Sequence, residues 1–153
     1  MKNRISWPDY FQSIAQLVAS RSTCLRRQVG AVLVKNNQIL STGYNGAPAN
    51  ITHCEQAGCL RAQMKVPSGE KHELCRGVHA EQNAICQAAK HGISIYGSAL
   101  YCTNSPCSIC TKMLINAGIV EVHYEADYAE NAALNLLHEA GVKIYYEDCL
   151  HNM

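Results

Sequence analysis

Apolar residues recur at helical spacing over residues 9–20. One stripe of this stretch carries Tyr10, Ile14, Leu17 and Val18. Pro8 and Asp9 are residue types that suit the first turn of a helix. The spacing therefore predicts a first helix near the N-terminus.

The rest of the pattern predicts a hairpin followed by alternating helices and strands. Residues 29–35 form a dense apolar run, Asn36-Asn37 is a turn signal, and residues 38–44 resume the pattern, which is typical of a β-hairpin. Beyond residue 78, helical stretches at 79–90, 107–117 and 129–140 alternate with strands at 100–103, 119–124 and 142–146. Crossover helices make the later strands parallel. We therefore expect an α/β fold in which helices cover a central sheet, with residues 1–153 in one domain.

Residues 45–78 break this regularity. The stretch has no clean periodicity and carries glycine, proline, three cysteines and two histidines. Structureless segments of this length are uncommon in compact domains unless they are functional or tied down. A bound metal ion is one way in which this segment could be held in a fixed conformation.

The amino-acid composition indicates what kind of molecule the protein binds. The net charge is +1 with 16% charged residues, so no strong field favours nucleic acid or a membrane, and a small-molecule substrate fits better. We find no secretion signal and no stretch long enough to span a bilayer, and we expect a cytoplasmic protein. Nine cysteines in such a setting indicate metal binding or core packing more than disulfides. Cys86 and Cys102 lie in apolar surroundings and are expected to be buried.

The main chemical signal is His79-Ala80-Glu81 together with Pro106-Cys107 to Cys110. His79, Cys107 and Cys110 supply three zinc ligands, and a catalytic zinc site keeps three protein ligands and one position for water. Zinc lowers the pKa of such a water, and Glu81 is placed to take its proton. Both motifs open predicted helices, whose N-termini stabilise thiolates. The alternative is a structural zinc knot in which Glu81 faces solvent.

The order of these motifs resembles the zinc-dependent nucleobase deaminases. The likeness extends to Ser22-Thr23-Cys24, to 29–34, to Ser41 through Pro48 and to 79–85, and Gly43-Tyr44-Asn45-Gly46 makes the chain similar to the deoxycytidylate (dCMP) deaminases of the cytidine deaminase superfamily. The resemblance implies a three-layer cytidine-deaminase-like fold with a central mixed five-stranded sheet. It also implies zinc-dependent hydrolysis of dCMP to dUMP and ammonia, which supplies thymidylate synthesis.

The resemblance also implies substrate contacts. Asn45 is expected to contact the nucleotide, although Asn-Gly is also an ordinary turn signal. The backbones of Ala80 and Ser105 are expected to hold the amide-like edge of the base. Two further groups come from the residues themselves. Arg26 and Arg27 are candidates for the phosphate, and Tyr124 and Tyr128 are candidates for stacking, with exposed arginines and core tyrosines as the plainer alternatives.

Some bacterial and phage members of this family carry a second, structural zinc, with ligands in the segment before the active-site helix. For this chain we expect the ligands Cys24, Cys54, His72 and Cys75, which would form a closed tetrahedral site and explain the long irregular segment. Cys59 or His53 is the alternative to one of these ligands.

Other functions stay open at this point. A related enzyme could act on cytidine, guanine, a riboflavin precursor or tRNA adenosine, although the last would want a basic surface for RNA. A noncatalytic zinc-stapled module would not need Glu81 beside an open metal position. The resemblance further implies a homo-oligomer, often a hexamer, with dCTP and dTTP as effectors.

Overall fold

The computed structural model describes residues 3–126 and 131–148, and these form one sheet with helices on both faces. The strands are β1 (Gly30–Lys35), β2 (Gln38–Tyr44), β3 (Ala99–Asn104), β4 (Glu121–Ala126) and β5 (Lys143–Tyr146). Their order is β2-β1-β3-β4-β5. Strand β1 pairs antiparallel with β2 and β3, whereas β3 with β4 and β4 with β5 are parallel. The predicted mixed five-stranded sheet is confirmed.

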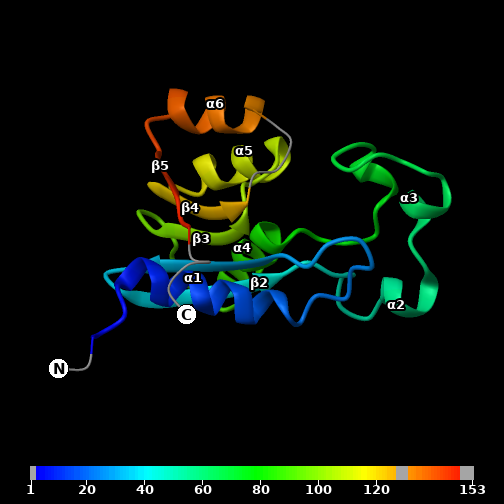
Figure 1. Cartoon of the computed structure of the whole chain (residues 1–153), viewed down its shortest axis with the longest axis horizontal. Coiled ribbons are helices and arrows are strands. Elements are labelled where there is room, and N and C mark those ends of the chain that lie inside the picture. The colour runs from blue at the N-terminus through cyan, green and yellow to red at the C-terminus, as the bar shows by residue number, and fades with distance from the viewer. Residues whose placement is uncertain (1–2, 127–130, 149–153) are drawn as a thin grey trace.

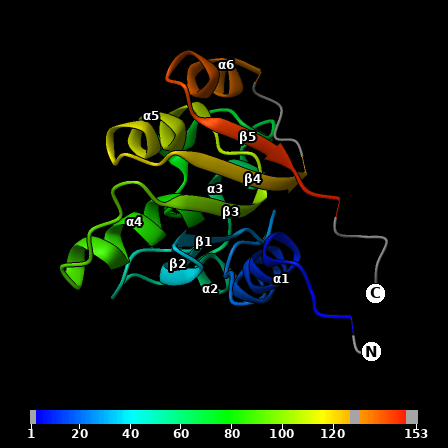
Figure 2. The ribbon, with the colours of Figure 1, turned by 90° about the vertical axis from the view of Figure 1, so that its left-hand side faces the viewer.

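The helices form the outer two layers of the fold. Helix α1 (Trp7–Ala19) covers one face of the sheet, while α4 (Ala80–Lys90), α5 (Ser108–Asn116) and α6 (Asn131–Glu139) lie on the other, as Figures 1 and 2 show. Successive residues of each strand point alternately to the two faces of the sheet. Val32 and Tyr101 pack with α1, whereas Leu33, Leu100 and Val122 belong to the core beneath α4 to α6.

Helix α1 buries only part of the stripe that is most apolar in sequence, because Ile14 and Val18 pack against the core while the other two residues are exposed. Leu17 is 71% exposed and Tyr10 is 41% exposed, whereas Phe11 and Ala15 are buried. The reason is a close approach to the sheet at Gly30, where an added Cβ would lie 2.1 Å from the carbonyl oxygen of Ala15. Small residues allow this contact between backbones, and the aromatic ring of Phe11 fills the space beside it, against Tyr101.

Helix α4 is seated on the sheet in a similar way. At Gly43 of β2, an added Cβ would lie 2.2 Å from the carbonyl oxygen of Ala80 and 2.4 Å from the backbone nitrogen of Ala84. Ser41 Oγ, two residues earlier on the same face of β2, donates to the carbonyl of Ala84 at 2.8 Å. Gly43 therefore fixes the depth at which the first turn of α4 meets the sheet.

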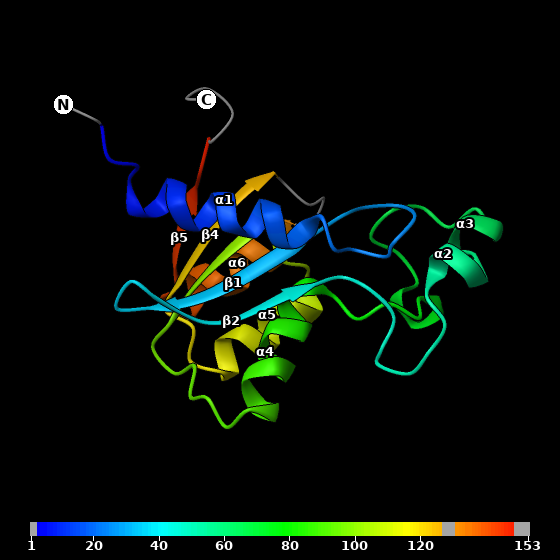
Figure 3. The ribbon, with the colours of Figure 1, turned by 90° about the horizontal axis from the view of Figure 1, so that it is seen from below.

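The irregular segment before α4 forms an arm beyond one end of the sheet (Figures 1 and 3). It contains α2 (Cys54–Ala57), α3 (Leu60–Gln63) and the 3-10 turn η1 (His72–Leu74). These elements are too short to produce a hydrophobic period, so the sequence pattern does not predict them. Backbone hydrogen bonds between Gly46 and Val78 close the arm at its base.

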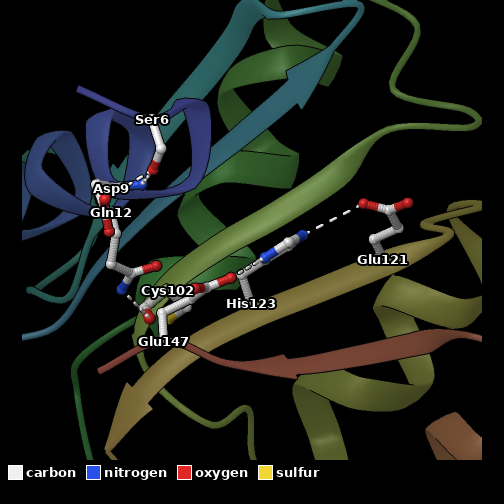
Figure 4. Close-up of polar contacts among 7 residues, drawn as sticks. All are labelled: Ser6, Asp9, Gln12, Cys102, Glu121, His123 and Glu147. Carbon is white, nitrogen blue, oxygen red and sulfur yellow. Dashed lines mark hydrogen bonds and ion pairs between the residues drawn. The ribbon is translucent and has the colours of Figure 1, made fainter. Parts of the chain in front are cut away.

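Several polar side chains form hydrogen bonds on the face of the sheet that α1 covers (Figure 4). Gln12 of α1 donates from Nε2 to the carbonyl of Cys102 at 2.8 Å. Nearby, His123 of β4 lies between Glu147 at 2.6 Å and Glu121 at 3.3 Å. These contacts lie on the face opposite the core that includes α4 and α5.

The cysteines follow the sequence prediction only in part. Cys102 is buried as expected, whereas Cys86 is exposed because it occupies the outer side of α4, away from its buried residues. All eight cysteines in the described ranges are free thiols. Within the same ranges, no helix combines the length and apolar character that crossing a membrane requires.

Candidate zinc centre and substrate cavity

Two helix N-termini carry the residues of the zinc motif. His79 is the N-cap residue of α4, and Gln82 Oε1 accepts a hydrogen bond from the His79 backbone nitrogen at 2.9 Å, which fixes the start of the helix. Cys107 is the N-cap residue of α5, and its Sγ accepts from the backbone nitrogen of Cys110 at 3.5 Å. Strand β3 leads into Cys107 through Ser105 and Pro106. The sheet and Gly43 thus bring the two helix starts together.

The donor atoms of the three expected ligands lie close together, with His79 Nδ1 near both sulfur atoms. This atom lies 3.4 Å from Cys107 Sγ and 3.3 Å from Cys110 Sγ. Typical bond lengths at a tetrahedral zinc separate a nitrogen ligand from a sulfur ligand by about 3.5 Å. In the part of the chain that the structure describes, this is also the single set of three metal-binding side chains whose donor atoms all lie within 4.8 Å of one another. The donor set and its spacing fit zinc.

Electrostatics favours deprotonated sulfur at this place. Hydrogen bonding from Cys110, together with His79, lowers the pKa of Cys107 to about 4. The partner thiol responds in the opposite sense, because its hydrogen bond to Cys107 and its burial raise the pKa of Cys110. The hydrogen bond with Cys107 also raises the pKa of His79. A metal ion bound by these three side chains would displace the protons that they carry.

Glu81 lies beside this cluster and is not one of the three ligands. Its side chain is 5% exposed, on the inner side of the first turn of α4. Burial is the largest cause that raises the pKa of Glu81 above its usual 4.5, and the neighbouring His79 opposes the shift. A buried carboxyl with a raised pKa is suited to accept a proton and to return it. The alternative in which Glu81 faces solvent does not fit this burial.

A cavity of about 280 Å³ opens onto the cluster and is lined by His79, Glu81 and Cys107. Its walls contain most of the predicted substrate residues: Arg26, Arg27, Asn45, Ala80 and Ser105. They come from the segment before β1, the turn after β2, the start of α4 and the end of β3. The fold thus gathers residues that are up to 79 positions apart in sequence, from Arg26 to Ser105.

Asn45 has both side-chain groups engaged by the backbone. Its Oδ1 accepts from the backbone nitrogen of Val29 at 2.9 Å, and its Nδ2 donates to the carbonyl of Arg27 at 2.8 Å. These bonds make Asn45 a support for the segment that carries Arg26 and Arg27. A direct contact with the nucleotide stays a prediction.

The other predicted contacts divide between the cavity and the core. The backbone nitrogen of Ala80 is in the first turn of α4, where N–H groups have no acceptor within the helix. The backbone nitrogen of Ser105 donates to the carbonyl of Ala126, and the residue lines the cavity. Tyr124 is buried in the core with its ring edge against Tyr146, and it does not line the cavity. Tyr128 lies outside the described residues.

The sequence pattern does not predict Arg61 as part of this cavity, and it does not predict that the ring of His72 packs against His79. Arg61 lies on α3, is 9% exposed and lines the same cavity. No period or motif distinguishes it, because it belongs to the irregular arm. The ring of His72 packs against that of His79 with centroids 5.1 Å apart, and both of its nitrogens are buried without a hydrogen-bond partner in the described structure.

The residues expected at a second zinc, Cys24, Cys54, His72 and Cys75, all line the same cavity, and so does Cys59. Among the described residues, no three of their donor atoms all lie within 4.8 Å of one another. Burial raises the pKa of the Cys54 thiol, and the charges of Cys24, Cys75 and Cys59 raise it further. The ring of His72 packs against that of His79. His53, the other alternative, has its Nδ1 3.1 Å from Thr23 Oγ1.

Comparisons with known proteins agree with this arrangement. The family described as the cytidine and deoxycytidylate deaminase zinc-binding region matches residues 5–126. ComE operon protein 2 of Bacillus subtilis is 40% identical over 142 residues, which cover 92% of this chain and 71% of that protein. Deoxycytidylate deaminase of Schizosaccharomyces pombe is 38% identical over 142 residues, which cover 92% of this chain but 44% of that protein. The chain thus spans less than half the length of the yeast relative.

A solved structure supports the same relation. The dCMP deaminase from the cyanophage S-TIM5, crystallised in complex with dCMP and dUMP, is 33% identical with a TM-score of 0.78, and the match covers 95% of this chain and 100% of that one. The family match includes His79, Glu81, Cys107 and Cys110. The chain therefore belongs to the cytidine and deoxycytidylate deaminase family.

Proposed function

We propose that this chain is a zinc-dependent hydrolase that converts dCMP and water to dUMP and ammonia. The observation that carries the proposal is a buried glutamate beside three zinc-type ligands at the bottom of one cavity. The names of the relatives, which are deoxycytidylate deaminases of yeast and phage, support the choice of substrate.

The zinc ion would be held by His79, Cys107 and Cys110, and when bound it acts as a Lewis acid that makes water acidic near neutral pH. Glu81 takes the proton of the attacking water while its oxygen adds to C4 of the cytosine ring. Glu81 delivers this proton to N3, takes the second proton of the former water from the new C4 hydroxyl, and passes it to the amino group. The bond from C4 to that nitrogen then breaks, the C4 oxygen becomes the carbonyl of dUMP, and ammonia leaves. The Ala80 N–H and the Ser105 carbonyl would orient the ring.

The substrate is tested by measuring ammonia release from dCMP, dCTP, deoxycytidine, cytidine, cytosine and guanine with zinc-loaded protein. We expect dCMP to give the highest kcat/KM. Equal turnover of cytidine and dCMP would contradict the proposed preference for a nucleoside monophosphate. Absence of turnover with every substrate in protein that retains zinc would contradict the deaminase activity itself.

We also propose that a second, structural zinc stabilises the arm. Cys24, Cys54 and Cys75 are three of its ligands, and the neighbourhood of Cys54 favours Cys59 over His72 as the fourth. Four such ligands form a closed tetrahedral site without a position for water. This ion would link the segment before β1 to α2, α3 and η1.

The setting of the enzyme follows from the family resemblance. We propose a cytoplasmic homo-oligomer, in the form of a hexamer, whose activity responds to dCTP and dTTP and whose product supplies thymidylate synthesis. The free state of the eight described cysteines is consistent with a reducing compartment. Sedimentation of the zinc-loaded protein, with and without each nucleotide, tests the assembly and its effectors together.

A further inference from the structure

Three arginines gather around one short loop of the cavity wall. Arg26, Arg27 and Arg61 all line the cavity, and each donates a hydrogen bond to residues 66–68, at 3.0, 3.5 and 3.4 Å respectively. They come from two segments that are separated by the whole β-hairpin. The loop therefore holds three guanidinium groups at one place.

Arg61 is the most buried of these arginines. The residue is 9% exposed, and its Nε is buried without a hydrogen-bond partner among the described residues. Its one hydrogen bond in the described structure goes from Nη2 to the carbonyl of Pro67, at the long distance of 3.4 Å. A guanidinium has five N–H donors, and a buried donor without an acceptor costs free energy. Most of the hydrogen-bonding capacity of Arg61 is thus left for a ligand.

The charge around this place favours an anion. Glu81 is the single carboxylate among the described residues that line the cavity, and it lies beside His79 at the zinc cluster. In the described ranges, neither Arg26 nor Arg61 forms a salt bridge. Arg61 and His79 line the same cavity. The positive charge of Arg61 therefore lies on the wall of the cavity that opens onto the zinc cluster.

We propose that Arg61 is the residue that selects a phosphate-bearing substrate, through hydrogen bonds from its guanidinium to the 5′-phosphate of the nucleotide. Arginine presents parallel donors that match two phosphate oxygens, which lysine does not. Arg26 and Arg27, which also donate to loop 66–68, complete the positive wall of the cavity. This inference rests on the proposed deamination of dCMP.

The test compares three variants on two substrates. Arg61→Gln removes the charge at similar size, Arg61→Lys keeps the charge without the fork, and Arg76→Gln is the matched control. Arg76 also joins the arm to a backbone carbonyl, that of Thr52 at 2.7 Å, but it does not line the cavity. The substrates are dCMP and deoxycytidine, which differ only in the phosphate. Zinc content and melting temperature are measured for every variant.

We expect Arg61→Gln to lower kcat/KM for dCMP by about 10- to 100-fold, mainly through KM, as the loss of hydrogen bonds to a charged group predicts. Its kcat/KM for deoxycytidine should stay within about 2-fold, Arg61→Lys should fall between it and wild type, and Arg76→Gln should match wild type on both substrates. An unchanged preference for dCMP in Arg61→Gln would overturn the proposal. So would an equal loss on both substrates, which indicates a merely structural role.

A binding measurement separates this inference from the proposed reaction. Inorganic phosphate should raise the melting temperature of wild-type protein and have a smaller effect on Arg61→Gln, or on Arg61→Lys if the first variant does not fold. If wild type fails to deaminate dCMP but shows this difference, the reaction is wrong and the phosphate site stands. If dCMP is deaminated and phosphate acts equally on wild type and variants, the role of Arg61 is wrong.

Discussion

Glu81 combines burial with an ionisable group, and this combination has a cost in stability. Burial raises the pKa of Glu81 above its usual 4.5 in the folded protein. A carboxyl with a raised pKa disfavours the folded state wherever it is ionised, and this penalty disappears as the pH falls below 4.5. We expect Glu81→Gln to raise the melting temperature of the metal-free protein at pH 7 and to lose this advantage toward pH 4. Thermal unfolding of this variant and of the exposed control Glu139→Gln measures it.

The same raised pKa predicts the acid limb of the reaction. Glu81 must be ionised to take a proton, so kcat/KM for dCMP should fall with decreasing pH at a midpoint above 4.5. A midpoint at or below 4.5 would contradict the role of burial.

Residues that act within a short motif are well predicted from sequence. His79 with Glu81, and Cys107 with Cys110, are close in the chain, and a helix start fixes their geometry. Tyr124 shows the limit of this reasoning, because nothing local reveals that β4 does not line the cavity. Arg61 shows the same limit, since only the folded arm brings it to the zinc cluster.

At the scale of elements, α1 shows why hydrophobicity alone does not identify the buried face. Phe11 is 1% exposed; its ring stacks on Trp7 and contacts the ring of Tyr101 at a tilt. Leu17 is 71% exposed. Phe11→Ala should lower the free energy of unfolding by about 3–5 kcal/mol. Leu17→Ala should change it by less than about 0.5 kcal/mol. Urea denaturation of the two variants compares them, and a larger loss at Leu17 would contradict the packing of α1.

Gly43 links the sheet to helix α4, which begins at the zinc motif. A Cβ at this position would meet backbone atoms of α4, so Gly43→Ala must displace the turn that carries His79 and Glu81. We expect a loss of about 1–3 kcal/mol in stability and a clear fall in kcat. Gly92→Ala is the control, because it has a positive φ of 67° but no atom within 4 Å of the added Cβ. Comparable losses of kcat in both variants would contradict this role of Gly43.

For the whole molecule, the arm is the part that sequence patterns describe least. Its elements α2, α3 and η1 are three or four residues long, so its order depends on contacts with distant segments and on the proposed second zinc. The regular α/β part follows from periodicity. Its helices bury one face against the sheet, and its strands contribute the side chains that pack beneath those helices.

Metal counting tests the proposed ligands of the arm. Wild-type protein should hold two zinc ions per chain, Cys59→Ser should hold one, and His72→Gln should hold two, because the ring of His72 packs against that of His79. The variant with one ion should also melt at a lower temperature. Loss of an ion from His72→Gln but not from Cys59→Ser would restore His72 as the fourth ligand.

The central claim concerns proton transfer by Glu81 beside a zinc ion held by His79, Cys107 and Cys110. The most direct measurement is ammonia release from dCMP by Glu81→Gln and by wild type, with zinc counted in the same samples. We predict that the variant retains its zinc and loses at least about 10²- to 10⁴-fold in kcat. Turnover of dCMP by zinc-loaded Glu81→Gln at a rate close to that of wild type would contradict the account.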